Sequence, residues 1–530
     1  MRNTLVISLI VLFSSAIVPA YAAKSGPVCN IESFPKYPEL KINYVTEYTE
    51  WSEETALAPG MFAPHCKVHG TIGKHINFEL LLPEKWNGKF AMGGGGGFVG
   101  SVVNTAATLY QALPKGYATV GTDTGHQAHS LDASWATNNL EAIVNFGGLA
   151  VHRTAVVSKA LTEAYYKNDI QRNLFIGCSR GGGQGLMAAQ RYPKDFDGIA
   201  AGAPAQNWTM GMGALMTQIQ QHMFPDPKDL TEAVVGLEEL KLIQDSYLAQ
   251  CDGKEDGVKH GFLNDPRDCK FDITTLACKD GKSSACLSSE QLAAMQRYYE
   301  GPIDHEGKPL WVGFPFGGEG DPVMGVGPMA AGGTKFIEKL DYQAGTASDF
   351  ETPRVPNAQY PFATSFMSSM IYHDPEWTYK GFKFENYRQD SAVVGKILNS
   401  DNPDLSAFRA YGGKMLLYTG WSDPLVSPLA TINYYEKAMA FDKTVIDDLR
   451  LFMMPGVAHC LGGDGPSIVN FLDMVDHWLE TDQAPDQTPA YWLDAETMQL
   501  NGSRLICAYP KVPTYKGKGS IREFTSYECK

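Results

Sequence analysis

Short apolar runs that end in glycine or small polar residues recur in the first and last parts of the chain. These runs stand at 89–92, 117–121, 173–177, 198–201, 414–419 and 449–454. A helix-like stretch over 184–191 follows the third run and ends before Pro193. Buried strands that alternate with helices are typical of a parallel sheet covered by helices. The pattern therefore predicts an α/β fold.

The alternation stops between residues 207 and 404, where Pro, Gly, Asp and Cys cluster around short helical pieces. A stretch of this length is ordinary for a domain. We therefore expect one α/β core, formed by residues 23–206 and 405–530, that is interrupted by an inserted domain over 207–404.

The first residues have the pattern of a secretion signal. Arg2 precedes an apolar run over 5–18, and Ala20-Tyr21-Ala22 supplies the small residues that a signal peptidase reads. The run is too short for a transmembrane anchor, and no second long apolar stretch follows it in the sequence. The sequence predicts a signal peptide over 1–22 and a secreted or periplasmic protein with no membrane anchor after cleavage.

The amino-acid composition restricts the kinds of molecule that the protein could bind. The net charge of −15 argues against nucleic acid and anionic membranes. The ten cysteines are an even number in a chain predicted to be exported, and none has the Cys-x-x-Cys spacing of a zinc site. We therefore expect disulfides.

A candidate nucleophile stands after the third apolar run. Residues 177–181 read Gly-Cys-Ser-Arg-Gly and match the G-x-S-x-G elbow, a sharp strand-to-helix turn that exposes the serine hydroxyl. The alternative is a glycine-rich turn with an incidental serine. The strand-like run before Ser179 and the helix-like stretch after it favour the nucleophile.

A serine nucleophile needs a base and an orienting acid, which follow it in the order acid, then histidine, in α/β-hydrolases. Asp423 and His459 each come just after a predicted strand, where open parallel sheets place their active sites. His477 also follows Asp423, but it lies in a segment over 468–479 with the spacing of an amphipathic helix. The pattern predicts a triad of Ser179, Asp423 and His459, with a purely structural histidine as the alternative.

Cysteines flank two members of this triad. Cys178 precedes Ser179 and Cys460 follows His459, so a hydrogen bond between serine and histidine would bring the cysteines within disulfide distance. The alternative is that each pairs elsewhere, because connectivity does not follow from sequence alone. The other eight divide into plausible local pairs: Cys29 with Cys66, Cys251 with Cys269, Cys278 with Cys286, and Cys507 with Cys529.

Together these motifs resemble the tannase and feruloyl esterase family. The resemblance rests on Cys-Ser at 178–179, Asp423, His-Cys at 459–460 and Gly-Gly-Gly-Gly-Phe at 94–98. Further similar stretches lie over 181–205 and 507–529, so the resemblance covers essentially the whole chain after the predicted signal. It implies an α/β-hydrolase core, a lid domain inserted between the serine and the aspartate, and a disulfide that joins the two active-site cysteines.

The resemblance also implies an activity: hydrolysis of esters of gallic, hydroxycinnamic or related aromatic acids, with mono(2-hydroxyethyl) terephthalate as a further candidate substrate. No cofactor is expected for catalysis. The oxyanion would be bound by the backbone N–H of Arg180 and by an amide of Gly95, Gly96 or Gly97. The alternatives are a peptidase with the same triad and a non-catalytic secreted binding protein on the same scaffold. The intact triad residues count against the latter.

The chain departs from the family pattern at the elbow. Family members often carry threonine after the nucleophile and arginine three residues later, whereas this chain has Arg180 and Gly183. Aromatic residues and methionines over 360–377 are candidates for the acyl pocket, with the core of the lid as the preferred alternative.

The chain also departs from the family at a calcium loop. The family pattern Cys-Asp-x-x-Asp-Gly-x-x-Asp-Gly is changed here over 251–261, which has one extra residue and His260 in place of an aspartate. Calcium prefers oxygen ligands. The remaining candidates for a structural Ca²⁺ are Asp252, Asp256 and the carbonyls of Val258 and Phe262.

Overall fold

The computed structural model describes residues 27–49, 63–102, 105, 109, 112–279, 286–321, 324–328, 355–494, 497 and 499–530. The predicted signal peptide lies outside these residues. A nine-stranded sheet forms the centre, in the order β1-β2-β3-β5-β4-β6-β7-β8-β9. Its strands are β1 (Leu40–Tyr48), β2 (His65–Ile72), β3 (Ile76–Pro83), β4 (Lys89–Gly93), β5 (Ala118–Thr122), β6 (Arg172–Cys178), β7 (Gly198–Gly202), β8 (Lys414–Gly420) and β9 (Leu449–Met454).

The part of the sheet from β5 to β9 is parallel, whereas β1, β2 and β3 pair antiparallel at one edge. All six apolar runs of the sequence are strands of the parallel part. Every residue of β5 and β7 is buried, as expected for strands covered on both faces. The predicted α/β fold is therefore confirmed.

Helices cover both faces of the sheet. α3 (Ala150–Tyr166), α4 (Arg180–Arg191) and α13 (Pro428–Phe441) share one apolar core with Phe175, while α14 (Phe471–Thr481) packs with Leu174 on the other face. Neighbouring residues of β6 thus point to opposite cores, as the pleat of a strand requires.

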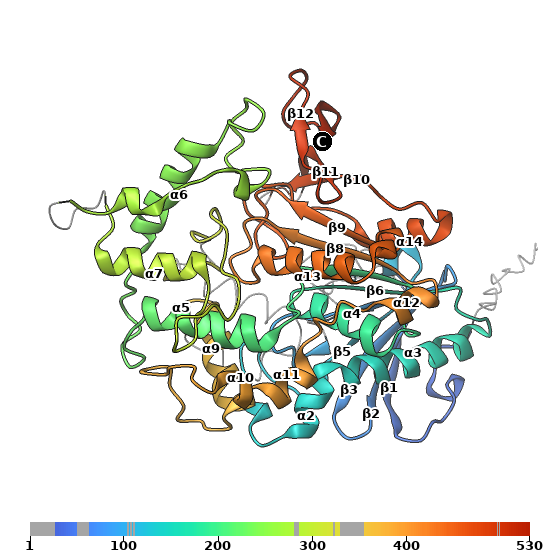
Figure 1. Cartoon of the computed structure of the whole chain (residues 1–530). Coiled ribbons are helices and arrows are strands. Elements are labelled where there is room, and N and C mark those ends of the chain that lie inside the picture. Colours follow the sequence, from blue (N-terminus) through green and yellow to red (C-terminus); the bar gives the residue numbers. More distant parts are fainter. Residues whose placement is uncertain are drawn as a thin grey trace, which may run out of the picture.

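The chain between β7 and β8 is helical and stands beside the sheet, at the left of Figure 1. Its helices are α5 (Met216–Met223), α6 (Leu237–Cys251), α7 (Ser289–Glu300), α9 (Gln359–Ser365), α10 (Tyr387–Asp390) and α11 (Ala392–Leu398). α12 (Ser406–Ala410) then leads back to β8, and α2 (Leu140–Val144) of the core contacts α11. Within its described residues the inserted segment adds no strand to the central sheet. We call it the lid.

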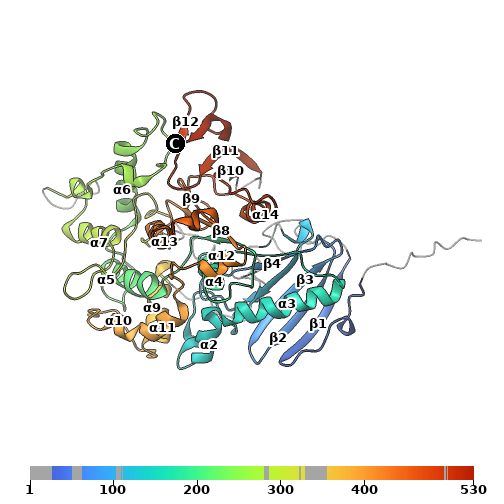
Figure 2. The same ribbon diagram turned by 45° about the vertical axis from the view of Figure 1, so that its right-hand side comes forward.

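Two small antiparallel sheets close the fold. β10 (Gln487–Leu493) pairs with β11 (Leu500–Cys507), and β12 (Pro513–Tyr515) pairs with β13 (Tyr527–Cys529). Both views place these strands above the sheet and beside the end of α6 (Figures 1 and 2). The C-terminal strands therefore contact a part of the lid that lies far away in sequence.

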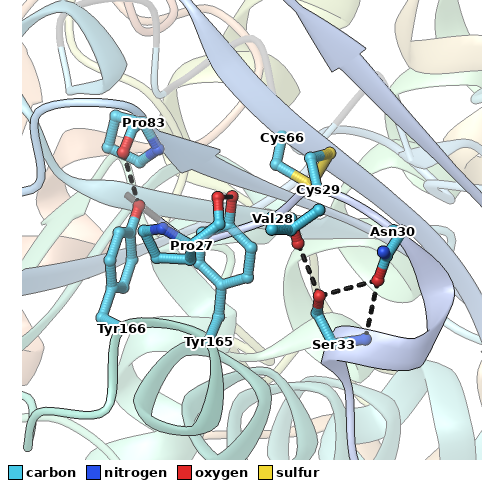
Figure 3. The surroundings of a disulfide bond; sticks show 9 residues. All are labelled: Pro27, Val28, Cys29, Asn30, Ser33, Cys66, Pro83, Tyr165 and Tyr166. Atoms are coloured by element: carbon cyan, nitrogen blue, oxygen red, sulfur yellow. Dashed lines mark hydrogen bonds between the residues drawn. A yellow bond between two sulfur atoms is a disulfide. The ribbon is translucent and has the colours of Figure 1, made fainter. Parts of the chain in front are cut away.

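Five disulfides join the cysteines as Cys29–Cys66, Cys178–Cys460, Cys251–Cys269, Cys278–Cys286 and Cys507–Cys529. The first attaches the N-terminal segment to β2, where the Ser33 hydroxyl also donates to the Val28 carbonyl at 2.5 Å (Figure 3). No helix in the described ranges is both long and apolar enough to cross a membrane.

Candidate active site

Ser179 occupies a sharp turn between β6 and α4. Its φ of 62° and ψ of −120° are rare for a residue with a side chain. The surrounding backbone holds the turn, because the Ser179 N–H donates to the Gly202 carbonyl at 2.9 Å and its own carbonyl accepts from the N–H groups of Gly183 and Ala205 at 3.1 and 3.0 Å. This is the strand–turn–helix geometry that the elbow motif predicts.

Glycines make the turn sterically feasible. A Cβ atom at Gly177 would lie 2.6 Å from the carbonyl carbon of Gly181, and one at Gly94 would lie 2.6 Å from the Gly181 Cα. The elbow is therefore packed directly against the first glycines of the Gly94–Phe98 run.

His459 and Asp423 form a pair. His459 Nδ1 lies 2.8 Å from Asp423 Oδ2, and Asp423 Oδ1 accepts from the N–H groups of Leu425 and Val426 at 2.8 and 2.9 Å. The carboxylate is buried, with only 1% of the residue exposed. Since an ionised carboxylate can only accept, the imidazole carries its proton on Nδ1 and leaves Nε2 free to act as a base.

The Cys178–Cys460 disulfide brings the serine and the histidine loops together, with Cα atoms 5.9 Å apart. Among the described residues no hydrogen bond joins the Ser179 hydroxyl to His459. Such bonds are often long in unliganded enzymes and tighten when substrate binds. His477, the competing histidine, is exposed on α14.

A small cavity opens beside Ser179. Its wall includes Gly97, Trp208, Met212 and Phe362. Within the range 360–377, Phe362 borders this cavity. Phe366, Met367 and Met370 are buried in an apolar core that the lid shares with the catalytic core.

The glycines of the Gly94–Phe98 run differ in their surroundings. The Gly95 N–H donates to Gln184 Oε1 at 3.1 Å, so it is already engaged. Gly97 borders the cavity and has a φ of 55°, a conformation that favours glycine. Gly97 therefore lies at the cavity that Ser179 and Arg180 also border, whereas the Gly95 amide already has an acceptor.

The Arg180 side chain is fully buried. Its guanidinium lies 4.2 Å from the ring centre of Phe146 and 5.4 Å from that of Trp208, and Nη2 donates to the Phe146 carbonyl. Burial lowers the pKa of Arg180 to about 9. The sequence predicts a role for the backbone amide of this residue alone. In the structure the side chain also packs against the aromatic rings of Phe146 and Trp208.

The candidate calcium ligands of the lid do not fit a metal cage. Asp252 accepts the backbone N–H groups of His260 and Gly261 at 2.9 Å each, and Asp256 faces His260 Nε2 at 3.1 Å. Phe262 packs its ring against Gly456. Within the part of the chain that the structure describes, no three His, Cys, Asp or Glu side chains converge as metal ligands.

Comparison with known proteins agrees with this geometry. Residues 62–530 match the family model described as tannase and feruloyl esterase. The chain is 31% identical to a probable feruloyl esterase of Arthroderma benhamiae, over 86% of this chain and 82% of that protein. It is 30% identical to the mono(2-hydroxyethyl) terephthalate hydrolase of Piscinibacter sakaiensis, over 92% and 88% of the two chains.

Solved structures show the same fold. An esterase from Aspergillus oryzae superposes with a TM-score of 0.77 at 23% identity, and covers 94% of this chain and 98% of its own. Feruloyl esterase B from the same organism gives 0.75 at 25% identity, with the same coverage. The α/β-hydrolase architecture is thereby confirmed. The chain belongs to the tannase and feruloyl esterase family and is a carboxylic ester hydrolase.

Proposed function

We propose that this protein is a secreted serine esterase that hydrolyses esters of aromatic acids through an acyl-enzyme on Ser179. The observation that carries the proposal is the strained elbow at Ser179, which the Cys178–Cys460 disulfide joins to the His459–Asp423 pair.

The geometry supports a two-step reaction. His459 Nε2 takes the hydroxyl proton of Ser179 while the serine oxygen attacks the ester carbonyl, and Asp423 stabilises the imidazolium that forms. The backbone amides of Arg180 and Gly97 bind the oxyanion. His459 then gives the proton to the leaving alcohol. A water molecule attacks the acyl-enzyme with His459 again as base, and the acid is released.

The cavity supports an aromatic acyl group. Trp208, Phe362 and Met212 border the space beside Ser179, and flat rings pack favourably on aromatic and thioether side chains. The relatives named as a feruloyl esterase and as a terephthalate monoester hydrolase both act on esters of such acids by name. These names, together with the lining of the cavity, support an aromatic acid in the substrate of this protein as well.

A panel of esters tests the proposal. Methyl gallate, methyl ferulate, chlorogenic acid and mono(2-hydroxyethyl) terephthalate are assayed with the purified protein. We expect turnover of at least one ester, and its loss in Ser179→Ala and His459→Ala. His477→Ala is the matched control, since its side chain is exposed on α14 and should not affect turnover.

Two results would overturn the proposal: no turnover of any ester by a folded protein, or full turnover by Ser179→Ala. Secretion is tested separately. The mass of the protein recovered outside the cytoplasm should correspond to a chain that begins at Ala23, and an unprocessed chain there would contradict the predicted signal peptide.

A further inference from the structure

Three carboxylates crowd the lid loop that follows α6. Asp252, Glu255 and Asp256 lie within five residues of one another, directly after Cys251, which forms a disulfide with Cys269. Like charges this close destabilise a loop unless cations or hydrogen-bond donors compensate them. In the family pattern this compensation comes from calcium.

In this chain hydrogen-bond donors of the protein already occupy the carboxylates. Asp252 uses both oxygens for the backbone N–H groups of His260 and Gly261. Glu255 uses both for the N–H groups of Asn264 and Asp265, at 2.9 and 3.2 Å. Each of these oxygens thus already has one backbone N–H as a partner, and the four bonds fix the shape of the loop with donors of the protein itself.

Asp256 has a different partner. Its two oxygens lie 3.2 and 3.1 Å from His260 Nε2, and Oδ2 also accepts the Tyr515 N–H at 3.3 Å. The side chains of Asp256 and His260 are 2% and 4% exposed. The imidazole therefore lies buried in the loop, against the buried carboxylate of Asp256.

Arg504 of β11 completes the arrangement. Its Nη1 lies 3.2 Å from His260 Nδ1 and donates to the Tyr527 hydroxyl at 2.8 Å, while Nη2 donates to Asn264 Oδ1 at 2.5 Å. A guanidinium can only donate, so Nδ1 accepts and the proton of a neutral His260 sits on Nε2, directed at Asp256. The guanidinium also stacks on the Tyr527 ring at 4.3 Å.

Arg504 is 1% exposed, which makes it a buried cation among the three acids. Burial lowers its pKa, while the acidic residues 252, 255 and 256 act in the opposite direction. Buried charges persist in proteins when nearby groups of opposite charge and hydrogen bonds compensate them. Both Nη atoms of this guanidinium are hydrogen-bonded, and the three acids attract its charge.

We infer that Arg504, relayed through His260, takes the place of a divalent cation in the 252–262 loop, so that this esterase folds and retains its lid without calcium. The replacement has a second consequence. A metal would compensate the loop from within the lid, whereas Arg504 ties it to the C-terminal strands.

The loop reaches the predicted active site through Phe262. A Cβ atom at Gly456 would lie 2.5 Å from the Phe262 ring, and Gly456 precedes His459 by three residues. Phe262 also shares a cavity wall with Ser422, the neighbour of Asp423. The loop that His260 and Arg504 complete therefore contacts, through Phe262, the segment that leads to the predicted base.

The metal content and the thermal stability of the full-length protein test the inference without any substrate. Protein purified in buffers with calcium is analysed for bound metal, and its Tm is measured in excess EDTA and in excess CaCl₂. We expect less than a stoichiometric amount of calcium and the same Tm in both solutions. One calcium per chain, together with a Tm that falls by several degrees in EDTA, would overturn the inference, because a ligand that binds only the native state raises Tm.

Two variants test the replacement itself. Arg504→Met and His260→Ala should each lower Tm by about 1–3 °C, equally in EDTA and in calcium, because each leaves buried polar groups without a partner. His305→Ala, at an exposed position of the lid, is the matched control and should leave Tm unchanged. An unchanged Tm in both test variants would contradict the role of Arg504 and His260, while the assignment of Ser179 as nucleophile would stand unaffected.

Discussion

Cys178 and Cys460 are joined across 282 residues of sequence, and each is the chain neighbour of a predicted catalytic residue. The disulfide therefore fixes the relative position of Ser179 and His459 through the backbone. The imidazole itself is oriented by its hydrogen bond to Asp423 at 2.8 Å.

Replacing both cysteines tests this constraint. In Cys178→Ala/Cys460→Ala we expect kcat to fall by about 10²-fold with a small change in KM, because a misplacement of about 1 Å between reacting groups has an effect of this size. The lid double variant Cys278→Ala/Cys286→Ala is the matched control, since that bridge closes a separation of eight residues in the lid. Equal kinetics in the two double variants would argue against a positioning role.

Gly420 offers a second test of how the acid and base loops meet. A Cβ atom there would lie 2.0 Å from the Val457 carbonyl oxygen, which accepts the Ser422 N–H at 3.0 Å. We expect Gly420→Ala to push the loop of Asp423 away from that of His459, to lower the free energy of unfolding by about 2–3 kcal/mol and to reduce kcat.

The control for Gly420 is Gly211→Ala. Position 211 lies in a helical segment of the lid (Thr209–Leu215), where an added Cβ would meet no atom within 4 Å. This variant should keep wild-type kcat and stability. Comparable losses at the two positions would mean that the acid and base loops do not depend on the close contact.

His126 gives a pH-dependent stability. Burial lowers its pKa to about 4, while the unfolded chain has the ordinary value of 6.5. Above pH 6.5 both states are neutral. As the pH falls from 6.5 towards 4, the unfolded state binds a proton that the native state does not, so stability is lost in this window, by about 3 kcal/mol in total.

Urea unfolding of wild type and His126→Asn at pH 7 and pH 4.5 measures this effect. Asparagine can still donate a hydrogen bond to the Phe98 carbonyl, which accepts from His126 Nε2 at 2.9 Å. We expect the variant to lose less stability between the two pH values. The comparison is necessary because burial raises the pKa of the nearby Asp123 to about 7, which has the opposite effect on stability in acid. Parallel losses in both proteins would show that His126 titrates normally.

The parallel strands could be predicted because burial on both faces leaves an uninterrupted apolar run, as in β7. The antiparallel strands β1 to β3 were missed, although β3 alternates buried and half-buried positions with a clear period of two. The sheet order, in which β5 precedes β4, depends on contacts between distant segments and leaves no local pattern.

Some residues of the candidate site could likewise be predicted from the sequence, and others could not. Ser179, Asp423 and His459 could be located because each follows a strand and two of them stand next to a cysteine. Gln184, which engages the Gly95 amide, and Arg504, which reaches His260, gave no signal. Their roles depend on which side chain approaches them in space, and His260 and Arg504 are 244 residues apart. The loss of an aspartate at position 260 was readable, but not the residue that compensates for it.

The contact between Arg504 and Asn264 also determines when, during synthesis of the chain, the lid loop can be completed. A ribosome delivers the lid loop long before β11, because 240 residues separate the two partners. Until Arg504 has been translated and, in an exported chain, translocated, three acidic side chains of the loop lack their internal cation. Completion of the lid is thus coupled to the last strands of the fold, and a chain interrupted before them would contain Ser179, Asp423 and His459 but not the residues that stabilise the loop beside them.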